Sequence, residues 1–280
     1  MSTILVPTDF TDAAKNASNY AARFAKDLQS SVILFHAYHV AFVPTADAPM
    51  AINIDPTELQ NDNLTLLQQE ANSLIGAVGV EIECIAKEGF AVDEILQLEN
   101  EKKPDLIIMG LSSVGAVSEF LLGSIATDVM GKTNTPVIIV PEKASYQPIK
   151  KIAFASDYET EIDTDELKTL KHIIKMCNAK LYILNVEKEK EDIEVDKAIQ
   201  MMKMENHFDD IEHTHHLPID DDLIHGLKSF VAEHEIDMIA MIPHKHNLLS
   251  RMFKESNTKK MAFHSEIPLL TLHSSHRNNE

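Results

Sequence analysis

Short apolar runs alternate with amphipathic stretches along the whole chain. Apolar runs rich in β-branched residues predict buried strands, and stretches with apolar positions three or four residues apart predict helices. In the first half the predicted strands are 4–6, 31–36, 80–86, 106–109 and 137–140, and the predicted helices are 13–28, 57–78, 91–102 and one that begins at Ser124. Strands that alternate with helices and are apolar on both faces indicate an α/β fold with a parallel sheet covered by helices.

The same order of elements recurs in the second half. Here the predicted strands are 151–155, 180–185, 211–217, 238–241 and 269–271, and the predicted helices are 165–176, 195–204 and 220–233. Asp9 matches Asp157 at an offset of 148 residues, and Asp105 matches Asp237 at an offset of 132. The chain is therefore predicted to contain an internal duplication.

A short polar segment that contains two prolines separates the two copies. Pro141 and Pro148 bracket this segment, and such a composition is typical of a linker. We therefore predict one domain over residues 1–146 and a second over residues 147–280.

The composition excludes several classes of protein. With 280 residues, 44% hydrophobic and 25% charged, the chain can form one large globular domain or two smaller ones. No apolar run approaches the roughly 20 residues of a membrane helix, and the first residues lack the basic start of a secretory signal. A formal net charge of −19 disfavours binding to a phosphate backbone. We expect a cytoplasmic protein with no membrane or nucleic-acid partner.

A candidate anion-binding segment follows the fourth predicted strand of the first half. Gly110 follows this strand, and Gly123 and Ser124 begin the next predicted helix. Ligands bind at the carboxyl edge of open parallel sheets, and a helix N-terminus can hold a phosphate. Because the intervening loop has no Lys or Arg, backbone amides and the hydroxyls of Ser112, Ser113 and Ser124 would hold the anion. The alternative is that both glycines are turn residues and Ser124 is an ordinary N-cap.

These segments resemble the universal stress protein family, in a tandem form with two family domains in one chain. The resemblance rests on residues 4–10, 35–37, 105–110, 122–124 and 134–137. The family's nucleotide motif, G-x-x-G-x9-G-[ST], maps onto Gly110, Ser113, Gly123 and Ser124, so a serine replaces the second glycine. The resemblance implies that each half is an open five-stranded parallel sheet of order 3-2-1-4-5, with helices on both faces.

The resemblance also implies a set of nucleotide-binding residues. The contact to adenosine falls on Asp9 and the position beside adenine falls on Ala37. The complete implied set is Pro7, Thr8, Asp9, Ala37, Met109, Gly110, Ser112, Ser113, Gly123, Ser124 and Val137. The implied ligand is ATP or a related adenine nucleotide, with or without Mg²⁺. Asp9 has a second interpretation, as a residue that ends a strand and caps the following helix.

From this resemblance we expect a stress-response protein that binds an ATP-like nucleotide in its first half as a regulatory switch. The alternatives are a nucleotide-free scaffold and a slow ATPase. No catalytic residue is predicted, because the chain has no G-x-S-x-G elbow and no nucleophile beside a base. Family domains dimerise through the last strand, so the two halves could form an intramolecular pseudo-dimer, and a homodimer is the other possibility.

The second copy is predicted to be degenerate at the nucleotide motif. At the offset of 132, Ile242 replaces Gly110 and Glu255 replaces Gly123. A glutamate at a phosphate cradle would repel the anion, so we expect no second nucleotide site.

Twelve of the fourteen histidines lie in the second copy. Alternate residues of a strand face the same side, so His213 and His215 would share a face and His216 would point away. Two histidines with an acid, either Glu212 or one of residues 220–222, could hold a divalent metal. The favoured interpretation is a polar edge strand, and no metal ligand is assigned from the sequence.

Overall fold

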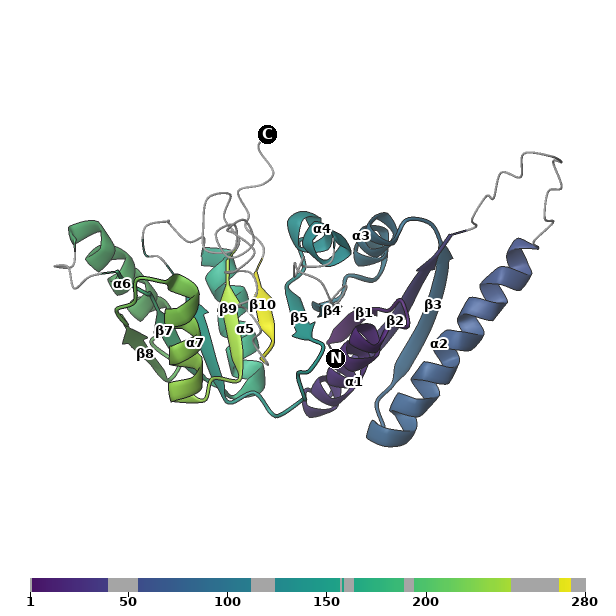
Figure 1. Ribbon diagram of the computed structural model, residues 1–280, viewed down its shortest axis with the longest axis horizontal. Coiled ribbons are helices and arrows are strands. Elements are labelled where there is room, and N and C mark those ends of the chain that lie inside the picture. The colour runs from purple at the N-terminus through teal and green to yellow at the C-terminus, as the bar shows by residue number, and fades with distance from the viewer. Residues whose placement is uncertain are drawn as a thin grey trace.

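A single twisted sheet runs through both halves of the chain (Figure 1). The computed structural model describes residues 2–39, 55–111, 124–156, 158, 164–188, 194–242 and 267–272. Within these residues the strand order is β3-β2-β1-β4-β5-β10-β9-β6-β7-β8. Every pair of neighbouring strands among them is parallel except β5 and β10, which are antiparallel.

The first half follows the predicted order of elements. Its elements are β1 (Thr3–Pro7), α1 (Asp12–Asp27), β2 (Ser31–Tyr38), α2 (Pro56–Val78), β3 (Ile82–Glu88), α3 (Ala91–Lys102), β4 (Leu106–Leu111), α4 (Ser124–Lys132) and β5 (Val137–Pro141). The strands are ordered β3-β2-β1-β4-β5, which is the predicted 3-2-1-4-5 arrangement of a parallel sheet.

The second half repeats this arrangement. Its elements are β6 (Lys151–Ala155), α5 (Thr164–Cys177), β7 (Lys180–Leu184), α6 (Val195–His207), β8 (His213–His216), α7 (Leu223–His234), β9 (Met238–Met241) and β10 (Leu269–Thr271). The order β8-β7-β6-β9-β10 is again 3-2-1-4-5. The predicted fold class is confirmed in both halves.

Helices cover both faces of the sheet, which explains why the strands are almost continuously apolar. One face, with buried Ile4, Val6 and Leu34, packs against α1 and α2, and its continuation in the second half packs against α5 and α6. The other face, with buried Leu5 and Ile33, packs against α3 and α4, and continues under α7.

The duplication extends to individual hydrogen bonds. In the first half the Asp105 carboxylate accepts a hydrogen bond from the backbone N–H of Thr3 at 2.8 Å. In the second half the Asp237 carboxylate accepts one from the backbone N–H of Lys151, also at 2.8 Å. Each aspartate therefore fixes the start of the first strand of its half against the start of the fourth.

The two halves are joined through their last strands. In the antiparallel β5–β10 pair, Ile138 lies opposite Leu270 and both side chains are fully buried. The Thr271 hydroxyl adds a hydrogen bond to the carbonyl oxygen of Val137 at 3.3 Å.

The segment between the halves packs against α1. The Asn16 side-chain amide donates to the carbonyl oxygens of Pro141 (3.0 Å) and Ala144 (2.9 Å). The Tyr146 hydroxyl donates to the Asp27 carboxylate at 2.6 Å. This part of the predicted linker is therefore anchored to the first half.

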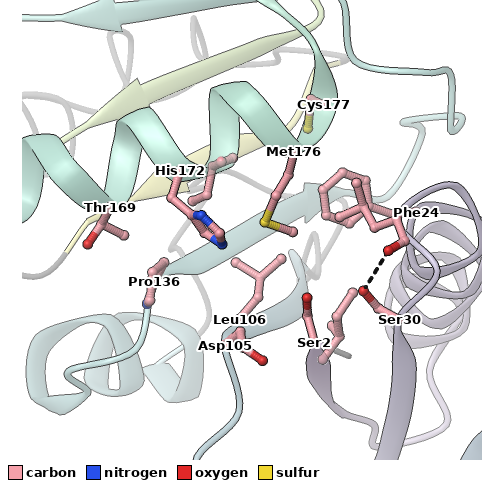
Figure 2. A pocket seen from close by; sticks show the side chains of 13 residues that line it. Ser2, Phe24, Ser30, Asp105, Leu106, Pro136, Thr169, His172, Met176 and Cys177 are labelled. Carbon is pink, nitrogen blue, oxygen red and sulfur yellow. Dashed lines mark hydrogen bonds between the residues drawn. The ribbon is translucent and has the colours of Figure 1, made fainter. Parts of the chain in front are cut away.

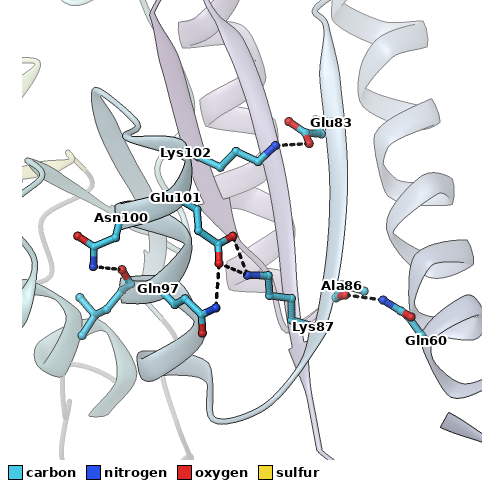
Figure 3. A network of polar contacts seen from close by, with 9 residues as sticks. Gln60, Glu83, Ala86, Lys87, Gln97, Asn100, Glu101 and Lys102 are labelled. Carbon is cyan, nitrogen blue, oxygen red and sulfur yellow. Dashed lines mark hydrogen bonds and ion pairs between the residues drawn. The ribbon is translucent and has the colours of Figure 1, made fainter. Parts of the chain in front are cut away.

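The outer edge of the first half carries a polar network between β3 and α3 (Figure 3). Lys87 pairs with Glu101 at 2.9 Å, and Lys102 pairs with Glu83 at 2.6 Å. The hydrogen bond from Lys87 lowers the pKa of Glu101, and Gln97 adds a second hydrogen bond to the same carboxylate. Charged residues of this kind are typical of edge strands, where they oppose pairing with another chain.

Differences from the predicted elements are confined to their ends. β3 begins at Ile82 and extends to Glu88, two residues beyond the predicted end. α7 begins at Leu223, three residues later than predicted, because Asp222 is its N-cap and accepts from the backbone N–H of Ile224. Among the described residues, no helix is both long and apolar enough to cross a membrane.

Candidate functional site

The turn between β1 and α1 is fixed by side-chain hydrogen bonds. Phe10 has a φ of 64°, in the left-handed region that non-glycine residues seldom occupy. The Thr8 hydroxyl accepts from the backbone N–H of Phe10 at 3.1 Å. Asp9 Oδ1 accepts from both the backbone N–H (3.1 Å) and the hydroxyl (2.6 Å) of Thr11. The chain thus passes directly from strand to helix and leaves the Asp9 side chain exposed at the carboxyl edge of the sheet.

Thr11, and not Asp9, is the N-cap of α1. The Thr11 hydroxyl accepts from the backbone N–H of Ala14 at 3.3 Å. The interpretation of Asp9 as the helix cap is therefore wrong, although Asp9 supports the cap by orienting Thr11. Within the described part of the chain, Asp9 Oδ2 takes part in no hydrogen bond, so this oxygen stays available as an acceptor.

The end of β2 is attached to the same turn. The Nδ1–H of His36 donates to the carbonyl oxygen of Thr8 at 2.7 Å, which requires the proton to be on Nδ1 because a carbonyl can only accept. The backbone N–H of Thr8 donates to the carbonyl oxygen of Phe35 at 2.8 Å. The half-buried Ala37 follows directly, so it lies at the sheet edge beside the turn.

Gly110 lies inside β4, opposite Val140, and is not a turn residue. A Cβ atom at this position would be 2.4 Å from the carbonyl oxygen of Ala13, at the start of α1. Glycine is needed here because the first turn of α1 packs directly on the β4 backbone. This contact places the end of β4, including the buried Met109, next to the β1–α1 turn.

Most of the described members of the implied set meet at this edge. Pro7, Thr8, Asp9, Ala37, Met109 and Gly110 come from the carboxyl ends of β1, β2 and β4. Val137 does not join them. It is the first residue of β5, fully buried and opposite Ile107, three residues before the level of Gly110, and a rise of 3.3 Å per residue puts it about 10 Å from the edge.

The phosphate-cradle residues lie mostly outside the described residues. Ser112, Ser113 and Gly123 fall in the undescribed range 112–123, and Ser124 is the first residue of α4. Sequence reasoning did not identify Thr11 or His36 as residues that position the edge. The signal for Thr11 is present, since a threonine followed by an acidic residue at a helix start is a common N-cap pattern.

The second half repeats the turn but not the glycine of the fourth strand. Tyr158 has a φ of 54°, and its backbone N–H donates to the hydroxyl of Ser156 at 3.3 Å, as Phe10 does to Thr8. At the position of Gly110 stands Ile242, whose side chain is buried. The second half thus holds a buried side chain at the position where the first half has a glycine packed against the Ala13 backbone.

An apolar cleft of about 40 Å³ lies at the opposite, amino edge of the sheet, between the two halves. Figure 2 shows His172 and Met176 of α5 pointing toward Leu106 and Phe24 of the first half. Nucleotide-sized pockets measure about 300–1,000 Å³. This cleft is therefore too small to be the predicted site.

The acid near His213 and His215 is not one that the sequence suggested. Glu212 pairs with Lys180 at 2.9 Å, and Asp220 pairs with His225 at 2.5 Å. Glu205, from α6, approaches both histidines instead. The prediction that His213 and His215 share a face is confirmed, since both approach the same carboxylate.

Comparisons with known proteins agree with this architecture. The model of the universal stress protein family matches residues 1–141. Universal stress protein MJ0577 of Methanocaldococcus jannaschii is 28% identical over 155 residues, covering 51% of this chain and 96% of its own length. Universal stress protein MJ0531 of the same organism is 30% identical over 141 residues, covering 49% of this chain and 80% of its own.

The likeness of fold extends over both halves. The crystal structure of a universal stress protein from Archaeoglobus fulgidus has a TM-score of 0.73 and 18% identity, covering 97% of this chain and 98% of its own. The family match to residues 1–141, together with the repeated 3-2-1-4-5 sheet, leads to one conclusion. The chain belongs to the universal stress protein family, a family of stress-response proteins.

Proposed function

We propose that this chain binds ATP or a related adenine nucleotide at the carboxyl edge of its first half, and that binding acts as a regulatory switch without clear catalysis. The observation that carries the proposal is the convergence of Asp9, Ala37 and Gly110 from the ends of three strands at one edge of the sheet. The family match over residues 1–141 supports a nucleotide as the ligand.

Asp9 is the proposed acceptor for the ribose hydroxyls. Its Oδ1 is occupied by Thr11, which fixes the orientation of the carboxylate. The exposed Oδ2 can then accept hydrogen bonds from a ligand without losing a bond to the described residues. An acidic side chain at a strand end that binds ribose hydroxyls is a common arrangement in parallel α/β folds.

Ala37 and Met109 form the proposed adenine wall. Ala37 is small and half-buried, so it leaves space for a planar ring at the end of β2. Met109 is buried at the end of β4, and its thioether packs favourably against aromatic rings. Pro7 and Thr8 complete the floor of this proposed pocket at the end of β1.

The proposed phosphate cradle is the start of α4. α4 begins at Ser124, and the dipole at the N-terminus of a helix favours an anion. The hydroxyls of Ser112 and Ser113, with Gly123, would complete the cradle.

The first test is a calorimetric titration of the full chain with ATP, with or without Mg²⁺. One site per chain is expected. Asp9→Asn keeps the acceptor for Thr11 but loses the charged acceptor for ribose, and a hydrogen bond to a charged group contributes about 1.5–3 kcal/mol, so affinity should fall roughly 10- to 100-fold. Asp157→Asn, the matched change in the second half, should leave the affinity unchanged. An equal effect of both variants, or no binding, would contradict the proposal.

Two other functions make different predictions in the same experiment. A slow ATPase would release phosphate, and Gly123→Glu should abolish that release. A nucleotide-free scaffold would show no heat of binding with any adenine nucleotide. Ala37→Leu separates a specific adenine pocket from weak anion binding, because it fills the proposed ring position and leaves α4 intact.

We also infer that the two halves form an intramolecular pseudo-dimer, with domains 1–146 and 147–280. The antiparallel β5–β10 pair supports this inference, since it joins the last strands of the two copies. The Tyr146 hydroxyl bonded to Asp27 supports a boundary directly after residue 146. Light scattering should give the mass of a single chain, whereas a homodimer would require a further interface.

A further inference from the structure

Three side chains in the second half converge in a geometry suited to a metal ion. Glu205 Oε2 lies 3.0 Å from His213 Nε2 and 3.3 Å from His215 Nε2. All three potential ligand atoms lie within 4.8 Å of one another. In a tetrahedral zinc site with bonds of about 2.0–2.1 Å, neighbouring ligand atoms are about 3.3 Å apart. The two separations from Glu205 are therefore close to those of such a site.

The hydrogen bonds of the His213 ring show which nitrogen could bind a cation. Its Nδ1 lies 2.8 Å from the carbonyl oxygen of Ile211, which can only accept, so Nδ1 carries a proton. In the neutral ring Nε2 then presents a lone pair to the Glu205 carboxylate. Two acceptors at this distance require either a second proton or a metal ion between them.

The two ring nitrogens of His215 likewise face two different groups. Its Nδ1 is hydrogen-bonded to the Tyr158 hydroxyl at 2.8 Å. Its Nε2 is buried and has no hydrogen-bond partner within the described part of the chain, although it faces Glu205. Metal-ligating histidines usually bond their second nitrogen to another group, and both rings do so here.

The first half has apolar side chains at the equivalent positions. Strand register places Ile82 in the row of Val32, and His213 in the corresponding row of Leu181. By the same register Cys84 corresponds to His215. Ile82 and Cys84 pack against the hydrophobic core. The two histidines thus replace core-packing residues, a change that costs burial energy unless their nitrogens are satisfied.

We propose that Glu205, His213 and His215 bind one divalent metal ion of the zinc type. Two imidazoles and one carboxylate suit Zn²⁺, and also Co²⁺ and Ni²⁺. The Glu205 side chain is 64% exposed, so water can enter and supply the fourth ligand. The ion would tie α6 to the edge strand β8, which Figure 1 shows at one end of the sheet.

The test is titration of the chelator-treated full chain with Zn²⁺ by calorimetry and with Co²⁺ by visible absorption. Both should be done in a background with His244→Ala and His246→Ala, so that other histidines contribute less. One ion per chain is expected, with a tetrahedral Co²⁺ spectrum. Glu205→Gln and His213→Asn should each weaken binding by at least 10- to 100-fold, which is the loss caused by removing a second-shell partner alone.

Three controls make the result decisive. Tyr158→Phe removes the group that orients His215 and should weaken binding about 10- to 100-fold without removing a ligand. His225→Asn changes an exposed histidine outside the cluster and should have no effect. Glu205 is exposed, so Glu205→Gln should preserve the fold, which circular dichroism would verify. Absence of binding, or equal binding by wild type and a folded His213→Asn/His215→Asn variant, would overturn the proposal.

Discussion

The two halves of this protein have the same fold, but their candidate ligand-binding side chains lie in different parts of it. Both keep the left-handed aromatic residue after the first strand, Phe10 or Tyr158, and the aspartate that starts the fourth strand, Asp105 or Asp237. Only the first half keeps a glycine, Gly110, at the carboxyl edge.

The second half has a histidine pair, His213 and His215, in its outer strand, where the first half has Ile82 and Cys84. Elements that fix the path of the chain have persisted in both copies, whereas groups suited to a ligand differ. The two copies therefore share the frame of the fold, and their candidate ligand groups lie in different parts of it.

The largest expected effect concerns the junction of the halves. Leu270→Ala removes a fully buried side chain from β10, and substitutions of this kind cost about 2–5 kcal/mol. Chemical denaturation should show this loss in the free energy of unfolding. If the halves fold as one unit, the midpoint measured by probes in each half should fall together. A loss confined to the second half would show that the junction does not couple them.

The next effect compares the stability cost of substitutions at two equivalent positions, Gly110 and Ile242. Gly110→Ala puts a Cβ 2.4 Å from the Ala13 carbonyl oxygen and should destabilise the first half by about 1–3 kcal/mol through overpacking. Ile242→Ala, at the equivalent position, should destabilise the second half by about 2–5 kcal/mol through a cavity. If Gly110→Ala proved neutral in thermal unfolding, the close packing of α1 on β4 would be wrong.

Much of the fold was predictable from the sequence because its determinants are local or periodic. Strand and helix patterns, with the family resemblance, predicted the 3-2-1-4-5 order in both halves. The role of Gly110 was not predictable, since it depends on contact with Ala13, almost a hundred residues away. The position of Val137 away from the edge was not predictable either, because a motif position says nothing about strand register.

The proposed metal site in the second half was only half predictable for a related reason. Strand alternation put His213 and His215 on one face, which is a local rule. Glu205 reaches them from α6 because of the way that this helix packs over the sheet. No spacing in the sequence indicates that contact.

A smaller loss of stability is expected when either of two helix caps is removed. Thr11→Ala removes the cap of α1 and should cost about 1 kcal/mol, as should Asp222→Ala at the start of α7. The two differ in function, because Thr11 also orients Asp9. Under the proposed function, only Thr11→Ala should weaken ATP binding as well as stability. If both variants bind ATP with the same affinity, Thr11 has no role in the proposed nucleotide site.

The smallest effect is a change in the pKa of one histidine of the second half, His225. The hydrogen bond that the His225 ring donates to the Asp220 carboxylate raises the pKa of His225 and lowers the pKa of Asp220. The pair therefore stabilises the fold above the ordinary carboxyl pKa of about 3.9 and below the ordinary imidazole pKa of about 6.5. Its contribution is lost as the pH rises through the folded pKa of His225. In an NMR titration, Asp220→Asn should return the His225 pKa to its usual range, and no change would contradict the pairing.

The proposed nucleotide site is tested most directly by identifying any small molecule that the purified protein carries. The full chain is purified without added nucleotide and denatured, and any released small molecule is identified by chromatography and mass spectrometry. Up to one adenine nucleotide per chain is expected. It should be lost in Gly123→Glu, which introduces the residue found at the equivalent position of the second half, Glu255. Nucleotide retained at the same level in Gly123→Glu, or none in wild type together with no heat of ATP binding, would contradict it.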